Sequence, residues 1–424
     1  MKSNRYRVIL INNSDTVGGA AIAARRLQTG LNHYTGFSSR MLVGSKRSQR
    51  SDVRQLTPSF VHWAIDQCAG KLGDLLSLQY LTYPYSAVLP LNKWIREAQI
   101  LNIHNIHGGY LSQWALPMLG HRVPIIWTLH DMWSFTGHCA YTYDCERWRT
   151  GCGDCPRIDE YPRLRWDSSH LLWCIRARMY ERVGVSLVTP SRWLAEQVRN
   201  SPLLTRFRVH CIPNGLDTEV FQPQDQGASR KALGIEQDAS VLMFGTQMLG
   251  LRRKGRDELL GALKQFSQES DRSVVLLLVG HGDVGSLKGL PQMSTRSVGE
   301  VEKENEMAAL YSASDVFLLP TLADNLPNVL LESTACGTPA ITYDVGGCGE
   351  VIRHMETGYL AGYRDSHDFA RGIRLLLEHE NLRREMGAKA RKMVLSEYTL
   401  RLQSTRYGEL FREQLSRVSR AGFR

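Results

Sequence analysis

The sequence has no long hydrophobic run. Its longest apolar stretches, residues 274–279 and 316–319, fall far below the roughly 18 residues that a helix needs to cross a bilayer. Near the beginning only residues 8–11 are apolar, which is too short for the hydrophobic region of a secretion signal. We therefore expect a protein of the cytoplasm, either soluble or bound peripherally to the inner face of the cytoplasmic membrane.

The sequence also has no zinc-finger, helix-turn-helix or RNA-recognition signature, so nucleic acid is not expected as a partner. Positive charge is nevertheless in excess, with 52 lysines and arginines against 42 aspartates and glutamates, a net charge of +10. Charge of this sign suits an anionic membrane surface or a phosphate-bearing substrate. Scattered, solvated arginines would explain it equally well.

The chain length of 424 residues exceeds the size at which one hydrophobic core stops growing, which predicts two or three domains. Short apolar runs alternate with amphipathic helical stretches, as in parallel sheets covered by helices. We predict an α/β fold of two doubly wound domains, residues 1–206 and 207–397, with turn formers at residues 212–217 close to the boundary. Residues 398–424 are predicted to form a helix that packs back onto the first domain.

Ligands of doubly wound sheets bind outside the carboxyl ends of the strands, so the loops there are candidate sites. In the first domain, Gly18 and Gly19 open a helix whose first N–H groups suit an anion, although a tight turn needs glycine in any case. His130 and Asp131 follow a strand predicted at residues 124–129. His130 could hydrogen-bond a substrate hydroxyl, with Asp131 orienting it, but a histidine at a strand end is more often structural.

In the second domain, a helix is predicted between Pro327 and Gly337, because proline suits a first helical turn and glycine ends a helix. The first N–H groups of that helix could bind a phosphate. They belong to Asn328, Val329 and Leu330.

Charged residues surround the start of this predicted helix. Asp324 lies in the loop ahead of it and Glu332 lies one to two turns inside, so two carboxylates would flank a bound diphosphate. Arg252, Arg253 and Lys254 follow an earlier strand and could neutralise such a group, or could be a solvated basic turn.

These residues resemble the signature of glycosyltransferase family 4, in which two glutamates separated by seven residues precede Ala-Cys-Gly-Thr-Pro. Here Asp324, seven residues and Glu332 precede the same five residues at 335–339. Residues 323–327 resemble the branch associated with extracellular polysaccharide synthesis, colanic-acid-type enzymes among them. Other matches run through nearly the whole chain: Gly18 and Gly19, residues 128–131, 190–191, 213–215, 254–255 and 314–316.

The resemblance implies the GT-B fold, in which two Rossmann-like domains face each other across a cleft. It implies a retaining, metal-independent enzyme that moves a sugar from a UDP- or GDP-sugar to a saccharide or lipid-linked saccharide acceptor in polysaccharide biosynthesis. No Asp-x-Asp metal motif occurs in the sequence, so the diphosphate charge would be met by Lys254, a neighbouring arginine and helix N–H groups.

The resemblance also implies a role for each matching residue. Asp324 would contact the donor sugar, Glu332 the ribose, and the backbone of residues 328–330 the phosphates, with His130 at the reacting centre. The sequence departs from the family in two places: Asp324 is one methylene shorter than glutamate, and a usual Gly-Arg pair reads Gly-Thr at residues 245–246. Either Arg252 or Arg253 would then supply that cation.

Four cysteines lie in a predicted insertion at about residues 137–156. They are Cys139, Cys145, Cys152 and Cys155. Their close spacing, which ends in Cys-x-x-Cys, predicts a structural tetrahedral zinc site in a reducing cytosol, with disulfides the less expected alternative. The first two are spaced more widely than zinc knuckles prefer, and His138 could compete as a ligand. Such a site would pin the loop that shapes the acceptor site.

Three other functions are compatible with these residues. A sugar-nucleotide epimerase of the same fold would use the histidine and carboxylates without an acceptor. A non-catalytic scaffold in a polysaccharide assembly complex would have no need to keep His130, Lys254 and Glu332. A zinc-dependent nucleic-acid binder is the least expected, and salt-sensitive binding to random duplexes would indicate it.

Overall fold

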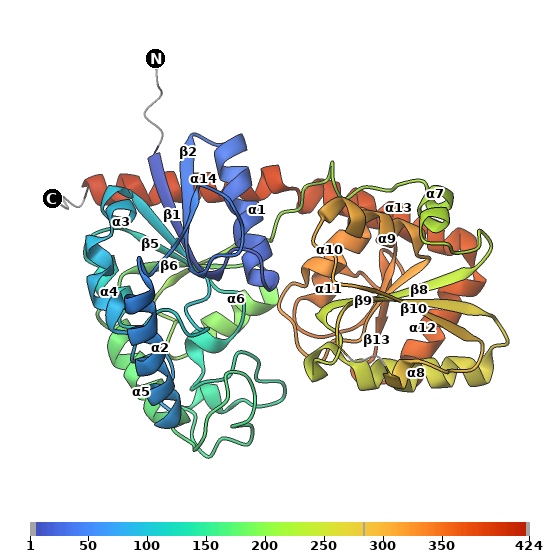
Figure 1. The fold of residues 1–424 in the computed structure, drawn as a ribbon, viewed down its shortest axis with the longest axis horizontal. Coiled ribbons are helices and arrows are strands. Elements are labelled where there is room, and N and C mark those ends of the chain that lie inside the picture. The colour runs from blue at the N-terminus through green and yellow to red at the C-terminus, as the bar shows by residue number, and fades with distance from the viewer. Residues whose placement is uncertain (1–5, 283–284, 421–424) are drawn as a thin grey trace. The chain divides into compact units, whose positions relative to one another are not determined.

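The computed structural model describes residues 6–282 and 285–420. The chain divides into two compact units (Figure 1): unit 1 is formed by residues 1–215 and 401–424, and unit 2 by residues 216–400. The last four residues of the helical segment predicted at residues 398–424 lie outside the described residues. Within the described ranges, no helix combines the length and apolar character needed to span a membrane.

Unit 1 contains a seven-stranded parallel sheet in the order β3-β2-β1-β4-β5-β6-β7. Its strands are β1 (Tyr6–Ser14), β2 (Phe37–Ser45), β3 (Val53–Gln55), β4 (Ile100–Ile103), β5 (Ile125–Thr128), β6 (Val185–Thr189) and β7 (Arg208–Cys211). Its helices are α1 (Gly19–Tyr34), α2 (Phe60–Leu75), α3 (Lys93–Glu97), α4 (Ala115–Gly120), α5 (Ser169–Tyr180), α6 (Arg192–Arg199) and α14 (Leu400–Arg420), with short 3-10 helices η1 (Pro84–Leu91), η2 (Trp133–Phe135) and η3 (Arg147–Arg149).

Both faces of this sheet are buried, as a parallel sheet requires. Successive residues of β1 point to opposite faces of the sheet. Ile9 and Ile11 pack into the hydrophobic cluster on one face, and Val8 and Leu10 pack into the cluster on the other. The strand therefore reads as a continuous apolar run, which is why the sequence predicts it so directly.

The last strand and the last helix both belong to unit 1. β7 pairs in parallel with β6, so the boundary predicted before residue 207 falls one strand too early. The unit instead ends at Gly215, within the predicted turn. In α14, Tyr407 and Phe411 are buried in the same cluster as Val8, and the Tyr407 hydroxyl lies 3.0 Å from Oγ1 of Thr128.

Unit 2 contains a six-stranded parallel sheet in the order β10-β9-β8-β11-β12-β13. Its strands are β8 (Ser240–Met248), β9 (Val274–His281), β10 (Met293–Gly299), β11 (Val316–Leu319), β12 (Ala340–Tyr343) and β13 (Gly358–Ala361). Its helices are α7 (Gln226–Ala232), α8 (Arg256–Glu269), α9 (Glu304–Ala313), α10 (Asn328–Ala335), α11 (Cys348–Val351), α12 (Ser366–Glu378) and α13 (Glu380–Glu397), with η4 (Arg252–Lys254) and η5 (Gly285–Leu287).

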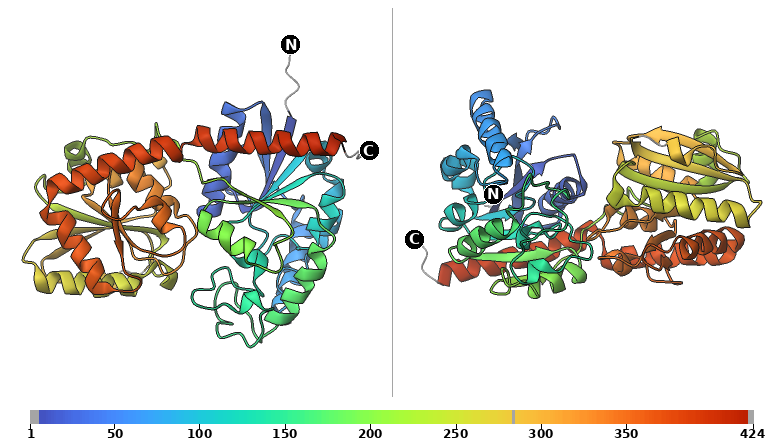
Figure 2. Two further views of the ribbon diagram at one scale, coloured as in Figure 1. Left: turned by 180° about the vertical axis from the view of Figure 1, so that it is seen from behind. Right: turned by 90° about the horizontal axis from the view of Figure 1, so that it is seen from below.

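The second sheet is also covered on both faces, as the two views of Figure 2 show for each unit separately. Val241 and Met243 of β8 pack into one core cluster, while Leu242 and Phe244 are completely buried on the opposite face. Each sheet is thus enclosed by helices, and the carboxyl ends of its strands are the edge from which ligand-binding loops emerge.

Candidate functional site

The first polar site lies in unit 2, at the carboxyl ends of the neighbouring strands β8 and β11. The loops after these strands touch closely: Leu322 donates its backbone N–H to the carbonyl of Arg253 at 2.8 Å, and the Thr321 hydroxyl donates to the same carbonyl at 3.0 Å. Gly255 makes this approach possible, because its φ is +75° and a Cβ there would lie 1.7 Å from the carbonyl oxygen of Pro320.

Asp324 forms the centre of this site. Its Oδ2 lies 2.5 Å from Nζ of Lys254 and 3.2 Å from Nη1 of Arg253. Asp324 as a whole is only 8% exposed. Burial would raise the pKa of the Asp324 carboxyl, but the two cations outweigh burial and hold that pKa below its ordinary value. The carboxylate is therefore ionised and both cations are held in place next to it.

Glu332 occupies the middle of α10 and is buried, with Oε2 accepting a hydrogen bond from the Tyr311 hydroxyl at 3.1 Å. Pro327 caps this helix and Asn328 is its first residue. The Leu330 N–H donates to the Pro327 carbonyl at 3.1 Å, within the first turn of the helix. The helix ends at Ala335 with Cys336 as its C-cap, and Gly337 follows with a φ of +74°.

A third loop, after β12, contacts Asp324. Gly346 has a φ of +59°, and a Cβ there would lie 1.7 Å from the carbonyl oxygen of Asp324. Only glycine combines this φ with so close a backbone contact. The loops after β8, β11 and β12 therefore converge around Asp324, and this arrangement of cations and a helix start can bind an anionic phosphate group.

The second polar site lies in unit 1, where β4 and β5 end. Nδ1 of His104 and Nε2 of His130 are 2.9 Å apart, and their rings are stacked with centroids 5.2 Å apart. Burial lowers the pKa of His130 to about 4 and that of His104 well below its ordinary value. Both rings are neutral at neutral pH, so His130 can exchange hydrogen bonds with a hydroxyl without adding positive charge.

Asp131 makes a different contact from the one predicted. Its Oδ2 lies 2.7 Å from Nε2 of His107, and its Oδ1 accepts from the Trp133 N–H at 3.0 Å. Asp131 thus orients His107, while its charge favours protonation of His130 against the larger effect of burial. The sequence delivers His107 in the loop after β4, but the pairing depends on β4 and β5 being neighbours in the sheet.

The Gly18-Gly19 turn lies at the end of β1, which is the neighbour of β4. Gly18 has a φ of +92°, and its carbonyl accepts the N–H of Ala21 at 3.0 Å, in the first turn of α1. Gly108, in the histidine loop, has a φ of +115°, and a Cβ there would lie 2.3 Å from Nδ2 of Asn13. The structure thus brings the carboxyl end of β1 against the histidine loop, because β1 and β4 are neighbours in the sheet.

The structure does not show the zinc site predicted at Cys139, Cys145, Cys152 and Cys155. Among the residues that the structure describes, no three or more histidine, cysteine, aspartate or glutamate side chains are placed so that they could hold a metal ion. The thiols have separate partners: Cys152 accepts the Gly137 N–H at 3.1 Å, and Cys155 lies 3.2 Å from Nε2 of His138. Burial raises the pKa of the Cys152 thiol to about 11, and the neighbouring Cys145 and Cys155 add to this increase.

Taken together, each unit presents polar groups on loops at the carboxyl edge of a parallel sheet. Unit 2 offers cations and a helix start to a phosphate, and unit 1 offers neutral histidines and a carboxylate to hydroxyl groups. Two such Rossmann-like units define the class of α/β proteins with two doubly wound domains.

Comparison with known families identifies the chain more closely. The family model described as glycosyltransferase family 4 matches residues 17–220, and the one described as glycosyl transferases group 1 matches residues 225–393. The chain belongs to this glycosyltransferase family, and the resemblance noted in the sequence is confirmed.

Curated relatives are similar over parts of the chain. A colanic acid biosynthesis glycosyl transferase of Escherichia coli, WcaC, is 27% identical over 60% of this chain and 62% of its own length. A D-inositol 3-phosphate glycosyltransferase of Catenulispora acidiphila is 31% identical over 40% of this chain and 44% of its length. The N-acetyl-alpha-D-glucosaminyl L-malate synthase of Bacillus anthracis is 27% identical over 74% and 76%. The chain spans less than two thirds of the first two relatives.

Solved structures share the fold. Sucrose-phosphate synthase of Thermosynechococcus elongatus has a TM-score of 0.68 at 17% identity, covering 97% of this chain and all of its own. HepE of Anabaena, solved with UDP-glucose, has a TM-score of 0.65 at 16% identity, covering 97% and 99%. WaaG, a lipopolysaccharide glycosyltransferase, has a TM-score of 0.64 at 15% identity, covering 95% and 99%. The predicted GT-B fold is confirmed.

The close approach at Gly255 gives a first prediction. Gly255→Ala should lower the free energy of unfolding by at least about 2 kcal/mol, because a left-handed φ disfavours a side chain and the Cβ would displace the Pro320 carbonyl. Urea denaturation measures this. Gly250→Ala is the matched control, since no atom lies within 4 Å of a Cβ there and its stability should stay within about 0.5 kcal/mol of wild type. Equal effects of the two substitutions would contradict the assignment.

The neutral histidines give a second prediction. The folded pKa of His130, about 4, lies below the roughly 6.5 of an unfolded histidine, so its contribution to stability is present above pH 6.5 and is lost as pH falls towards 4. Between pH 7 and pH 4.5, wild type should lose about 2 kcal/mol more than His130→Gln, because the variant lacks this titrating group. Urea unfolding at both pH values measures the difference; parallel pH profiles would refute it.

Proposed function

We propose that the protein transfers a sugar from a nucleotide diphosphate sugar to a hydroxyl group of a saccharide acceptor, with retention of anomeric configuration and without a metal ion. The observation that carries this proposal is the convergence of Lys254, Arg253 and the start of α10 on Asp324. By resemblance to the family, these residues would bind the donor.

The donor diphosphate would compete with Asp324 for its two cations. Lys254 and Arg253 already lie within 3.2 Å of the carboxylate, so little reorganisation is needed for them to meet a phosphate oxygen. Asp324, released from part of this pairing, would accept a hydroxyl of the donor sugar. Glu332 would accept a ribose hydroxyl, and the backbone of Asn328 and Val329 would donate to phosphate oxygens, with Leu330 at the same turn.

In the transfer step, the acceptor hydroxyl oxygen bonds to the anomeric carbon as the bond from that carbon to the β-phosphate oxygen breaks. The acceptor proton passes to the departing phosphate, and the nucleoside diphosphate leaves with the negative charge that Lys254 and Arg253 offset. His130, neutral at the pH of the cytoplasm, hydrogen-bonds a sugar hydroxyl near the reacting centre, and Asp131 holds His107 beside it. Gly18 and Gly19 let a ligand approach the backbone.

The acceptor we propose is a saccharide carried on a lipid at the inner face of the cytoplasmic membrane. Support comes from the name of the relative WcaC, which refers to colanic acid biosynthesis, and from the positive charge of unit 1, which suits an anionic surface. The UDP-glucose bound by HepE supports a UDP-sugar as the first donor to test, with GDP-sugars as the next.

An epimerase is the second candidate function, because the same groups could act on a donor alone. Mass spectrometry and proton NMR of the reaction separate the two: transfer consumes the donor and yields a larger saccharide whose new linkage keeps the donor's anomeric configuration. An isomerised donor of unchanged mass would favour the epimerase. Donor binding without turnover under any acceptor would favour a scaffold.

Donor binding can be measured before the acceptor is known. A donor present at about 100 times its dissociation constant should stabilise the protein by about 2.7 kcal/mol, a rise of about 5–11 °C in the melting temperature of a unit of this size. Lys254→Ala and Glu332→Ala should each remove this rise and abolish transfer. Lys264→Ala, which removes an exposed lysine of α8, is the matched control and should behave as wild type. A normal rise in both site variants would remove the site assignment.

Metal independence can be tested on the same preparation. Because Lys254 and Arg253 would supply the charge that a divalent cation supplies elsewhere, turnover should continue at an unchanged rate in excess EDTA. Loss of turnover that magnesium or manganese restores would show that a metal ion takes part.

A further inference from the structure

The outward face of α2 is hydrophobic along its whole length. Val61, Ile65, Leu72 and Leu75 recur at helical spacing and are 64%, 52%, 56% and 50% exposed. Cys68, also exposed, completes the stripe. A surface helix normally turns such a stripe towards the core, so this helix presents the reverse of the usual pattern. We call this set of side chains the α2 stripe.

Inward contacts fix the orientation of α2. Asp66 is buried and accepts the backbone N–H of Tyr85 at 2.9 Å. Gly70 and Gly73 are also buried, and a Cβ on either would lie within 2.6 Å of the side chain of Tyr83 or Thr82. Because only small or hydrogen-bonded residues fit against the unit, the α2 stripe cannot turn inward. In the right-hand view of Figure 2, α2 projects from the body of unit 1.

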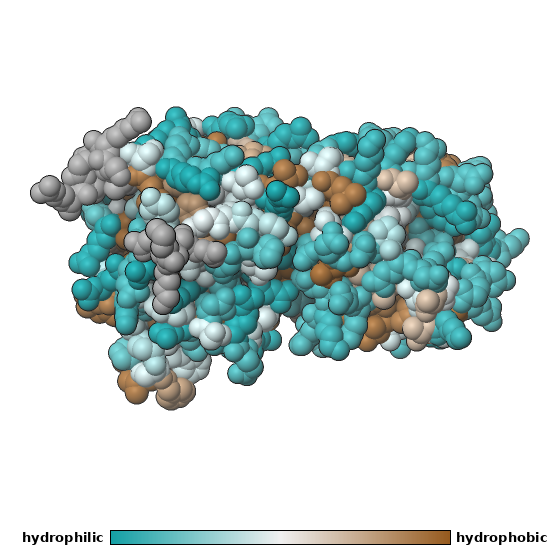
Figure 3. Space-filling view, turned by 90° about the horizontal axis from the view of Figure 1, so that it is seen from above, coloured by the Kyte–Doolittle hydropathy of each residue, from teal (hydrophilic) through white to brown (hydrophobic). Residues whose placement is uncertain are grey.

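Further exposed apolar residues extend this surface. Phe60 is 76% exposed and stacks on Trp63, with ring centroids 5.5 Å apart. Leu76 follows the helix and is 49% exposed, and Leu91 at the end of η1 is 65% exposed. In Figure 3, hydrophobic residues gather at the tip of the protrusion at the lower left, where α2 lies.

Aromatic and cationic side chains lie at both ends of α2. At the C-terminal end, the Ser77 hydroxyl oxygen accepts the N–H groups of Arg165 and Trp166 at 3.0 and 3.1 Å, and Trp166 is 50% exposed. At the N-terminal end is a cavity of about 710 Å³ lined by residues of α2, β3 and α3. Tryptophan and arginine with exposed apolar neighbours are the side chains that anchor proteins at the boundary of a bilayer.

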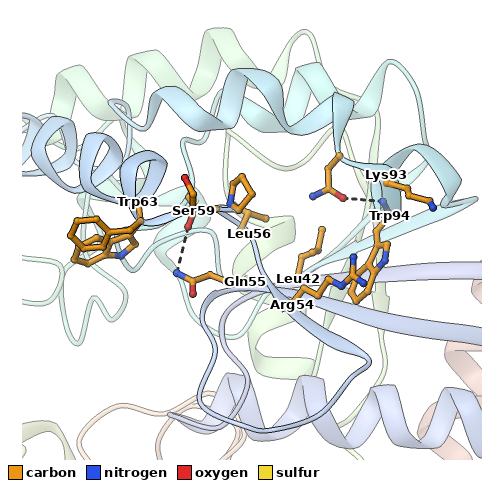
Figure 4. A pocket seen from close by; sticks show the side chains of 12 residues that line it. Leu42, Arg54, Gln55, Leu56, Ser59, Trp63, Lys93 and Trp94 are labelled. Carbon is orange, nitrogen blue, oxygen red and sulfur yellow. Dashed lines mark hydrogen bonds between the residues drawn. The ribbon is translucent and has the colours of Figure 1, made fainter.

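Figure 4 shows how this cavity combines the two kinds of side chain. Trp63 from α2 and Trp94 from α3 lie at its opposite ends, with Arg54 and Lys93 beside Trp94. The Arg54 guanidinium lies 4.5 Å from the centroid of the Trp94 ring. An apolar wall with cations at its edge suits a molecule that has a hydrocarbon part and an anionic head.

The charge of the chain is divided unequally between the units. The segments of unit 1 contain 32 lysines and arginines against 16 aspartates and glutamates, whereas residues 216–400 contain 20 against 26. The α2 stripe therefore belongs to the unit that carries all of the positive excess. A second copy of unit 1 would bring the same charge and be repelled, so an anionic partner fits this surface better.

We propose that the α2 stripe inserts into the headgroup region of an anionic phospholipid bilayer and holds unit 1 on the membrane. The helix lies in the plane of the interface, with its apolar residues among the acyl chains and the flanking arginines and lysines near lipid phosphates. This deepens the proposed function, because it names the element that brings the enzyme to a lipid-linked acceptor.

Vesicle flotation of the full chain tests the proposal. Wild type should float with vesicles that contain phosphatidylglycerol and bind vesicles of pure phosphatidylcholine more weakly, because the positive charge of unit 1 contributes only with the former. The double substitution Ile65→Ser with Leu72→Ser should weaken binding at least about tenfold, since two large apolar side chains no longer leave water. Leu395→Ser, at a leucine of α13 that is 46% exposed, is the matched control and should bind as wild type.

Two outcomes would overturn the proposal: wild type that binds neither vesicle, or an α2 double variant that binds as well as wild type. Light scattering in solution adds a third outcome. If wild type is a dimer that does not bind vesicles, and the double substitution converts it to a monomer, the α2 stripe is an interface between two copies of the chain. Because both substituted side chains are exposed, circular dichroism should remain that of wild type. The donor-induced rise in melting temperature is measured on the same samples. A normal rise without vesicle binding would contradict only the membrane proposal, whereas no rise would contradict the proposed donor site.

Discussion

The contact of Asp324 with Lys254 and Arg253 is the interaction on which the site in unit 2 depends. Three charged groups share a position that is largely removed from water, and removing any one would leave its partners poorly compensated. Glycine is needed at residues 255 and 346 because backbone from two other loops passes directly against the Asp324 loop. Charge compensation and close packing thus fix the same three loops, and they hold the cations ready before any ligand arrives.

Much of this arrangement follows from the sequence because both sheets are parallel and buried on both faces. The central strands β1, β8, β9 and β11 contain continuous apolar runs, and polar loops follow them. Short edge strands cannot be predicted in this way. β3 has three residues and β13 begins with glycine, so neither is recognisable as an apolar run. β7 falls in the second of the two predicted domains, because its pairing with β6 is a tertiary contact that local sequence does not contain.

Side-chain partners depend on strand order, which local sequence does not contain. Lys254 and Asp324 are 70 residues apart and meet because β8 and β11 are neighbours, and His107 meets Asp131 because β4 and β5 are neighbours. The cysteine loop shows that side-chain partners are also hard to predict for residues that are close together in the sequence. Close spacing in sequence predicts a shared metal ion, which stays a prediction. Cys152 accepts the Gly137 N–H and Cys155 lies beside His138, and spacing alone could not reveal those contacts.

The division of charge explains why the two units need different means of binding anions. Unit 2 has more acidic than basic residues, so its long-range field does not attract a nucleotide diphosphate, and affinity has to come from short-range contacts with Lys254, Arg253 and the start of α10. Unit 1 has the opposite balance, and a basic surface acts over a distance on an extended anionic partner. In the two proposals, a small, doubly charged donor would be held by preorganised groups, whereas a broad membrane surface would be met by many weak charges and an apolar helix.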